Sequence, residues 1–599
     1  MKAKHSFAHI FRAFAAISAL TLLISCGGKA APTGQTYAPG TYTASAKGYH
    51  GDVTVAVKVT KNKIASVRVL KHGETPGISD LAISGIPKAI VDSQSLAVDS
   101  VSGASFSSKA VIEATTAALK EAGADIEKLM VPGAAAEKEA DVELSADVVV
   151  IGAGGAGMAA GVSAHQNGAT VVILEKMAKV GGNTISAGGA MNAVDEGSET
   201  AIKNKDSVAL HFKQTYEGGD KKGDEVLVKT LVENAWASVE WLQSMGMKFL
   251  PEPFTVTGGL WPRAHKPVDP VGTGFFKTYN AYIEANKGIE VRLNAKAEKL
   301  IVENGKVVGV IATGKTGNKI TVKANKGVVI ASGGFGQNVA MRQEFNKQWP
   351  TLDETIKSTN HPGATGDGIM MGREVNAAIV QMENIQLLPL GDPETGSLSG
   401  NIETDVEKRI YVNIEGNRFV DEGARRDTMT LALFNQPQKK LWIVVDAHSY
   451  PEGTVKNNFN ETIDGLVADG RAFKGETVEE LAEKIGVPPA NLAATVAEFN
   501  KHVASKTPDA FGRTLYSVPL DKGPYYAGAR VPTVHHTMGG IKIDAETHVI
   551  DVNGNVIPGL YAAGEVTGGI HGSNRLGGNA LTDITVFGRI AGANAAQGK

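Results

Sequence analysis

A glycine-rich turn near residue 150 has the residue types and spacing that bind a dinucleotide. Gly152, Gly154 and Gly157 follow the apolar run 147–151 at GxGxxG spacing, and Glu175 ends a second apolar run about twenty residues on. Glycines let the backbone approach a pyrophosphate at a helix N-terminus, and the acid accepts hydrogen bonds from a ribose. The order of strand, turn, helix and acid therefore predicts a dinucleotide site.

The segment GGNTISAGG, which comes soon after Glu175, indicates which dinucleotide is bound. Its Asn183 and Thr184 stand in a Gly-Gly-Asn-Thr turn, and Gly188 and Gly189 close the motif. Such a turn is suited to wrapping the rest of a flavin nucleotide. The sequence therefore favours FAD, held without a covalent bond, over NAD.

A second motif, DSVSGASFS, runs from Asp99 to Ser107. With GTYTASAKGYHG upstream, it resembles the FMN-binding domain that is fused to some flavin reductases. There a flavin transferase attaches FMN through a phosphodiester to the last Ser or Thr of the motif, so the resemblance implies covalent FMN at Ser107. A helix that begins at this residue would favour a phosphate, although Ser105 to Ser108 would also cap such a helix. Ser105 and Ser108 are the alternative attachment sites.

Cysteine content restricts the redox chemistry. Cys26 is the only cysteine, so the chain has no internal disulfide, no CxxCH haem attachment and no thiolate-held iron–sulfur or zinc site. We expect no metal, and the redox chemistry must use organic cofactors. A net charge of −3 gives no indication of nucleic-acid binding.

The N-terminus has the pattern of an export signal. A basic start precedes the apolar run 13–24, which is too short to span a bilayer, and residues 23–26 (LISC) resemble a bacterial lipobox. We expect a signal peptide over 1–26, lipidation at Cys26 and a flexible tether over 27–38. The protein would then be exported as a cell-membrane lipoprotein on the periplasmic or extracellular face, held by its lipid anchor alone. A plain secretory peptide is the alternative.

A chain of 599 residues predicts several domains. Alternating patterns predict strands over 41–46, 52–61 and 64–70, a short element over 91–95 and a helix over 107–122. They form an FMN-binding domain over 39–131, followed by a linker over 132–145. Continuous apolar runs then predict buried parallel strands at 147–151, 170–174, 328–331 and 560–563, with a helix over 158–167.

Five motifs make a family recognisable: GGNTISAGG, STNHPGATGDG, RFVDEGARRD, HHTMGG and GLYAAGEVTGGIHGSNRLGGNAL. Over residues 146–599 the chain closely resembles the soluble fumarate reductase and urocanate reductase flavoproteins. The resemblance implies an FAD-binding domain over 144–386 and 531–599, and a capping domain over 387–530. The expected fold class is α/β, with a Rossmann-like FAD-binding domain, an inserted α+β capping domain and a small α+β FMN-binding domain before them.

The same resemblance assigns roles to residues. Arg426 is the implied proton donor, His535 and Arg575 clamp the substrate carboxylate, and His536 and Glu565 face the flavin. The other implied substrate contacts are Gly189, Leu388, Glu403 and Gly578. The other implied FAD contacts are Ala156, Ala297, Asp367, Ala580 and Leu581.

These roles describe reduction of the carbon–carbon double bond of an α,β-unsaturated carboxylate. Hydride from N5 of reduced FAD reaches the β-carbon, and negative charge moves into the carboxylate, where cationic donors stabilise it. A proton must then reach the α-carbon. Arginine holds its own proton tightly, so Arg426 must be held close by the cap and resupplied by neighbours. Glu403, Asp405 and Arg425 are candidates for that resupply.

The sequence departs from the fumarate pattern at the residues that would contact the end of the substrate opposite the clamped carboxylate. Fumarate enzymes bind the second carboxylate with a His two residues after a Gln and with a Thr-Glu pair, whereas here Leu388 follows Gln386 and no such pair is evident in SLSGNIETD. A second carboxylate buried without a partner is costly, so fumarate is disfavoured. Urocanate, acrylate, methacrylate and cinnamate-type acids remain. Glu403 would suit the urocanate imidazole, whereas Ala190 and Leu388 suit an apolar end.

We therefore expect a 2-enoate reductase of anaerobic respiration. Electrons from a membrane or periplasmic donor would enter at FMN, pass to FAD and reach the substrate. One alternative on the same fold is a dehydrogenase or oxidase working in the opposite direction, on succinate-like acids or amino acids. The other is a lipoprotein flavin electron carrier without enoate reduction.

Overall fold

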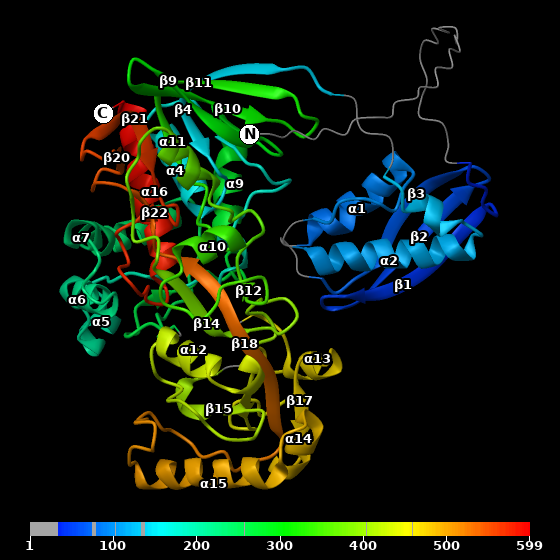
Figure 1. Cartoon of the computed structure of the whole chain (residues 1–599), viewed down its shortest axis with the longest axis vertical. Helices are drawn as coiled ribbons and strands as arrows, with labels where there is room; N and C mark the ends of the chain where they lie inside the picture. Colours follow the sequence, from blue (N-terminus) through cyan, green and yellow to red (C-terminus); the bar gives the residue numbers. More distant parts are fainter. Residues whose placement is uncertain are drawn as a thin grey trace, which may run out of the picture.

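The computed structural model describes residues 34–74, 79–101, 104–132, 138–256, 258–402, 404–457 and 459–598. The segment with Cys26, and Glu403, lie outside the described residues. No helix within the described ranges is long and apolar enough to cross a bilayer. Figure 1 shows a small N-terminal domain beside a large sheet domain, with a third unit, the cap, at the end of the large domain.

The N-terminal domain is a three-stranded antiparallel sheet packed against helices. Its strands are β1 (Gly40–Gly48), β2 (Gly51–Thr60) and β3 (Lys63–Lys71), and its helices are α1 (Asp80–Ser93), α2 (Ser105–Glu121) and α3 (Ile126–Leu129). Alternate residues of β2, such as Val53, Val55 and Val57, are fully buried against the helices. The three expected strands are present. The short element expected at 91–95 is instead the end of α1, because Gly85 and Pro87 inside α1 obscure its helical pattern.

The large domain is built on a mainly parallel sheet of eight strands in the order β20-β21-β11-β4-β5-β8, with β10 and β9 added at β11. These strands are β4 (Val142–Ile151), β5 (Val171–Leu174), β8 (Ile289–Arg292), β9 (Lys296–Glu303), β10 (Lys306–Thr313), β11 (Lys319–Ile330), β20 (His548–Ile550) and β21 (Val556–Ala562). Val148, Val149 and Val150 of β4 are fully buried, as expected for a parallel strand that is covered on both faces. The expected α/β fold is confirmed.

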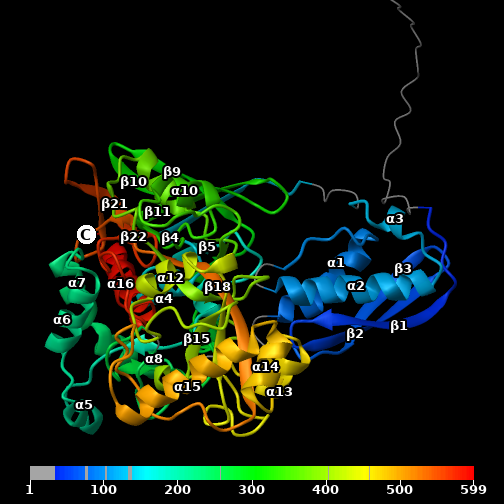
Figure 2. The same ribbon diagram turned by 60° about the horizontal axis from the view of Figure 1, so that its bottom comes forward.

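Two helices from opposite ends of this domain pack closely beside the sheet (Figure 2). They are α4 (Gly155–Gln166), which follows β4, and α16 (Asn579–Gln597), near the C-terminus. A Cβ added at Gly588 would lie 2.7 Å from the Ala156 carbonyl oxygen, and one at Gly592 would lie 2.1 Å from that of Ala160. The two backbones therefore touch only because these positions carry no side chain.

Further elements surround the sheet. The helices are α5 (Glu199–Asn204), α6 (Val208–Gly218), α7 (Glu225–Glu233), α8 (Ala235–Ser244), α9 (Thr273–Ala285), α10 (Val339–Phe345) and α11 (Asp367–Glu374). The short strands β6 (Met191–Asn192) and β7 (Ala264–His265) form a two-stranded sheet. A three-stranded sheet consists of β13 (Ile379–Val380), β19 (Gly540–Lys542) and β22 (Thr567–Gly568), in this order.

A long strand, β18 (Tyr525–Thr537), drawn in orange in Figure 1, runs from the cap into the large domain. The strands that share its sheet are β12 (Lys357–Ser358), β14 (Ile385–Gly391), β15 (Ile410–Asn413), β16 (Leu441–Val445) and β17 (Phe473–Gly475). The cap helices are α12 (Arg426–Phe434), α13 (Ile463–Ala468), α14 (Val478–Ile485) and α15 (Pro489–Ser505). Near its end at Thr537, β18 carries His535 and His536, so one continuous strand links the cap to these two residues.

The substitution Gly592→Ala tests the contact between α4 and α16. The added methyl group would meet the Ala160 carbonyl oxygen, so we expect a loss of about 1–3 kcal/mol in the free energy of unfolding. Thermal and denaturant unfolding measure this. The matched control is Gln597→Ala, an exposed position on the same helix, which should leave stability unchanged. Equal stability of the two variants would contradict the close packing of the helices.

Candidate active site

The turn between β4 and α4 has the geometry that phosphate binding requires. Gly152 has φ of +102°, and a Cβ there would lie 2.5 Å from the Ala331 carbonyl oxygen. A Cβ at Gly157 would lie 1.9 Å from the Gly152 carbonyl oxygen, so the helix can pack this closely against the turn only because residue 157 is glycine. A Cβ at Gly154, just before α4, would meet no atom within 4 Å. The residue just before α4 therefore leaves open space beside the start of the helix, where a pyrophosphate would be favoured.

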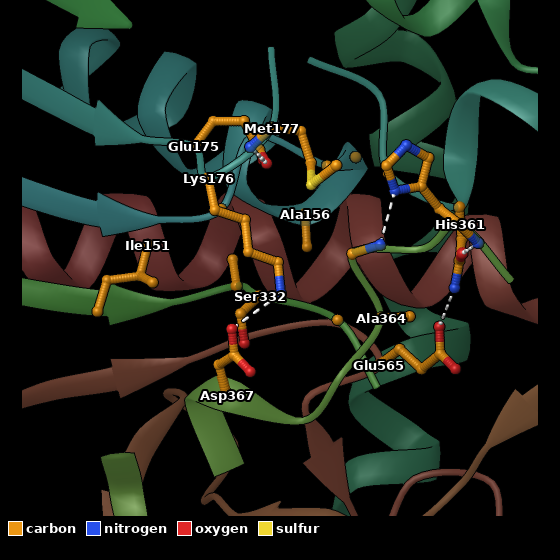
Figure 3. A pocket seen from close by; sticks show the side chains of 18 of the residues that line it. Ile151, Ala156, Glu175, Lys176, Met177, Ser332, His361, Ala364, Asp367 and Glu565 are labelled. Atoms are coloured by element: carbon orange, nitrogen blue, oxygen red, sulfur yellow. Dashed lines mark hydrogen bonds and ion pairs between the residues drawn. The ribbon is translucent and has the colours of Figure 1, made fainter. Parts of the chain in front are cut away.

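This turn borders a cavity with about 810 Å³ of empty space, part of which is open to solvent (Figure 3). Its lining includes nine of the expected FAD contacts: Gly152, Gly154, Ala156, Glu175, Asn183, Thr184, Ala297, Asp367 and Glu565. Gly157, Gly188, Gly189, His536, Ala580 and Leu581 are not part of the lining. The sequence did not single out Lys176, Ser332 or His361, which also line the cavity. His361 lies in the motif STNHPGATGDG, so this motif could have identified it as a residue of the cavity.

Charged side chains at one end of the cavity are fixed by their neighbours. Glu175 accepts the backbone N–H groups of Ala153 and Met177, both at 2.8 Å, and its burial raises its pKa. Lys176 Nζ lies 2.8 Å from Asp367 Oδ2 (Figure 3). The carboxylate at the end of β5 is thus held in place for a ribose.

The other end of the cavity is organised around Glu565. Asn183 Nδ2 donates to Glu565 Oε2 at 2.9 Å, and the Thr537 N–H donates to Oε1 at 3.0 Å. His536 Nδ1 lies 3.6 Å from the same Oε1. Burial raises the pKa of Glu565. Together with the open glycine turn and the Glu175 carboxylate, these groups fit a flavin dinucleotide along the cavity.

Two buried guanidinium groups meet on one oxygen atom. Arg426 is the first residue of α12 in the cap, and Arg575 lies in the loop before α16; they are 8% and 4% exposed. Gln386 Oε1 accepts from Arg426 Nη1 at 3.3 Å and from Arg575 Nη2 at 3.1 Å. Gln386 Nε2 donates to Asn574 Oδ1 and to the Arg575 carbonyl. Neither Gln386 nor Asn574 was predicted as a site residue, because their role depends on contacts across nearly 190 residues of chain.

The charge of this cluster comes from its arginines. Burial lowers the pKa of Arg575 to about 10, so it remains a cation at neutral pH. Burial first, and then Arg575 and Arg426, hold the pKa values of His535 and His536 well below the ordinary value, so both rings are neutral. His535 Nδ1 shares a hydrogen bond of 2.9 Å with Thr359 Oγ1. Two cations and a neutral donor can hold one carboxylate.

The remaining expected substrate contacts that the structure describes are closely packed against other parts of the protein. Leu388, in β14, belongs to the hydrophobic cluster of the cap. A Cβ at Gly189 would lie 2.4 Å from the Val271 carbonyl oxygen, and one at Gly578 would lie 2.3 Å from Asn192 Oδ1. Glu403 lies outside the described residues, so its role stays a prediction.

The two other candidates for proton resupply are exposed and lie in ion pairs. Arg425 pairs with Asp220 at 2.6 Å and with Asp427 at 2.8 Å. Asp405 pairs with Lys408 at 3.0 Å, and its side chain is 71% exposed. Such exposed pairs are the usual arrangement of surface charges. Neither Asp405 nor Arg425 takes part in the hydrogen bonds that join Arg426, Gln386 and Arg575.

Family comparison assigns both flavins. Residues 147–581 match the model of an FAD binding domain, and residues 48–120 match that of an FMN-binding domain. The second match contains Ser107, which lies in the first turn of α2 and is buried. The chain is therefore a flavoprotein for FAD and FMN, as expected.

The relatives are reductases of unsaturated acids. The chain is 38% identical to the NADH:acrylate oxidoreductase of Vibrio harveyi, covering 93% of this chain and 61% of that protein. It is 37% identical to the urocanate reductase of Eggerthella lenta, covering 93% and 92%. A flavocytochrome c3 fumarate reductase in an open conformation matches with a TM-score of 0.63, 35% identity and coverage of 76% and 78%. The chain thus spans about three-fifths of the first relative and nearly all of the second.

The substitution Glu175→Ala tests the ribose end of the cavity. It removes a buried carboxylate that holds two backbone N–H groups, so we expect the affinity for FAD to fall at least about tenfold. Titration of the apoprotein with FAD, followed by flavin fluorescence, measures this. The control is Glu290→Ala on β8, whose side chain is 48% exposed. An unchanged affinity in Glu175→Ala would show that FAD does not use this carboxylate.

Proposed function

Because the chain belongs to the fumarate reductase and urocanate reductase family of flavoproteins, we propose that it reduces the carbon–carbon double bond of a small α,β-unsaturated monocarboxylate. The observation that carries the proposal is the convergence of Arg426 and Arg575 on a single acceptor oxygen. Glu565 lines the FAD cavity, and the nearby Arg575 charge partly opposes the rise that burial causes in its pKa, so the two sites are neighbours.

The residues of this site have distinct tasks. FAD, when bound, supplies a hydride to the β-carbon of the substrate. Arg575 and His535 hold the carboxylate and stabilise the charge that develops on its oxygens. Arg426 gives a proton to the α-carbon from the cap side. Burial of the guanidinium groups excludes water, which strengthens these interactions and protects the enolate from competing proton sources.

The chemistry of β14 supports a monocarboxylate. Leu388 occupies the place where fumarate enzymes carry a histidine, and it packs into the apolar cluster of the cap. An apolar side chain offers no hydrogen bond to a second carboxylate, whose burial without a partner would be costly. Acrylate, methacrylate, urocanate and cinnamate-type acids each carry one carboxylate and fit this description.

We further propose that electrons reach FAD from FMN on the N-terminal domain. That domain contacts the cap through Tyr49, whose hydroxyl group accepts from Arg471 Nη2 at 3.1 Å while the guanidinium carbon lies 4.7 Å from the ring centroid. Lys47 Nζ lies 3.6 Å from Asp469 of the cap. Tyr49 also touches Phe106, next to Ser107, so the proposed FMN site borders this contact. Export with a lipid anchor at Cys26 would keep the protein near a membrane or periplasmic donor.

Reoxidation of the reduced enzyme by a panel of acids tests the proposed reaction. The FMN- and FAD-loaded chain, reduced with a viologen dye, should be reoxidised by acrylate- or urocanate-type acids and much more slowly by fumarate. Arg426→Ala removes the proton donor, so turnover should fall about 10²-fold or more while the FAD content is unchanged. Asp427→Ala, which changes the next residue of α12 and its ion pair with Arg425, is the control. Oxidation of succinate in place of enoate reduction, or full activity of Arg426→Ala, would contradict the proposal.

The substitution Tyr49→Ala tests the electron route. Loss of the ring and hydroxyl group should weaken docking of the N-terminal domain to the cap about tenfold. After the fully reduced enzyme is mixed with an enoate, reoxidation of FAD should keep its rate, and reoxidation of FMN should slow. Tyr49→Phe keeps the ring but loses the hydroxyl group, so its rate of FMN reoxidation should lie between those of Tyr49→Ala and the wild type. Equal FMN reoxidation in Tyr49→Ala and the wild type, at equal FMN content, would show that this contact does not serve the transfer.

A further inference from the structure

A buried carboxylate contacts the hydroxyl group that is proposed to carry FMN. Ser107 Oγ donates a hydrogen bond to Glu74 Oε2. Each of the two residues is 3% exposed. Glu74 follows β3 and Ser107 lies in the first turn of α2, so packing of the helix on the sheet brings the two side chains together.

The orientation of Glu74 is set by its surroundings. Its Oε1 accepts the His50 backbone N–H at 2.9 Å, which leaves Oε2 for the serine. A Cβ at Gly48 would lie 2.5 Å from Oε1, so the end of β1 makes room for the carboxylate by carrying glycine. The carboxylate is therefore held as an acceptor that points one oxygen at one hydroxyl group.

The neighbouring serines lack this arrangement. Ser108 Oγ donates to the Ala104 carbonyl, four residues back, and accepts the Val101 N–H, both at 2.9 Å, so its hydroxyl group is used in local backbone contacts. Ser105 is exposed at the start of α2. Among these three described serines, Ser107 is the one with a carboxylate as hydrogen-bond acceptor. Deprotonation of a hydroxyl group by an adjacent base is the usual way to make serine nucleophilic.

We propose that Glu74 is the proton acceptor in the attachment of FMN to Ser107, an inference that rests on the proposed attachment site. With FAD as donor, Ser107 Oγ attacks the phosphorus atom of the FMN half of the pyrophosphate. The Oγ–P bond forms, the bond from that phosphorus to the AMP half breaks, and AMP leaves. The hydroxyl proton passes to Glu74 Oε2 and from there to solvent. The new phosphodiester then lies at the N-terminus of the 17-residue helix α2, whose amides favour an anion.

Attachment can be measured directly on the full-length chain. The protein is produced without a flavin transferase and then incubated with a purified transferase and FAD, and covalent flavin is read as fluorescence in a denaturing gel. Glu74→Gln keeps the shape and the bond from the His50 N–H, but its amide group donates to Ser107 Oγ and cannot take the proton. We expect kcat for labelling to fall about 10²-fold, with KM for the protein unchanged. Glu121→Gln, at the exposed far end of α2, should label like the wild type.

Two further variants separate the possible failures. Labelling of Ser107→Ala at the wild-type rate would show that the proposed attachment site itself is wrong. Loss of labelling in Ser107→Ala, together with wild-type kcat in Glu74→Gln, would overturn the role of Glu74 alone. A Glu74→Gln variant with raised KM and normal kcat would show a structural role and would also overturn it. Ser108→Ala should keep full labelling.

Discussion

The site depends on the burial of two guanidinium groups that share one hydrogen-bond acceptor. Removing each cation from water costs several kcal/mol unless partners replace the lost hydration, roughly as for other buried ions. A neutral amide oxygen, from Gln386, is a modest partner for two positive charges. A carboxylate is a much better one, because the hydrogen bonds become charge-assisted. A carboxylate bound between Arg426 and Arg575 would therefore make stronger hydrogen bonds with them than the Gln386 amide does.

The rest of the fold holds this cluster together. Arg426 comes from the cap, whereas Arg575 comes from the loop before α16, which is itself fixed by close backbone packing on α4. The strand β18 crosses from the cap into the large domain and delivers His535 and His536, which stay neutral because they are buried beside the same cations. A movement of the cap relative to the large domain would thus separate the two guanidinium groups.

Local patterns in the sequence were sufficient for the nucleotide turn and for the strands. Gly152, Gly154 and Glu175 stand in one short βαβ unit, so their spacing predicts their geometry. The bond from Ser107 to Glu74, the contact of Tyr49 with Arg471 and the bridging role of Gln386 join distant segments, and no local pattern reports such contacts. The helix α1 was missed because its glycine and proline conceal a face that tertiary packing stabilises. The resemblance to known reductases identified Arg426 and Arg575 as site residues. Only the folded structure shows that both donate to the same oxygen of Gln386.

A crystal structure of the FAD-loaded chain with a saturated monocarboxylate, such as propionate, tests the central claim most directly. The account predicts that the carboxylate lies beside the flavin ring, with its oxygens within hydrogen-bond distance of Arg575 and its α-carbon facing Arg426. The amide of Gln386 would then give up at least one of its two guanidinium partners. A ligand bound elsewhere, with both arginines still on Gln386 and no space between them and the flavin, would contradict the account.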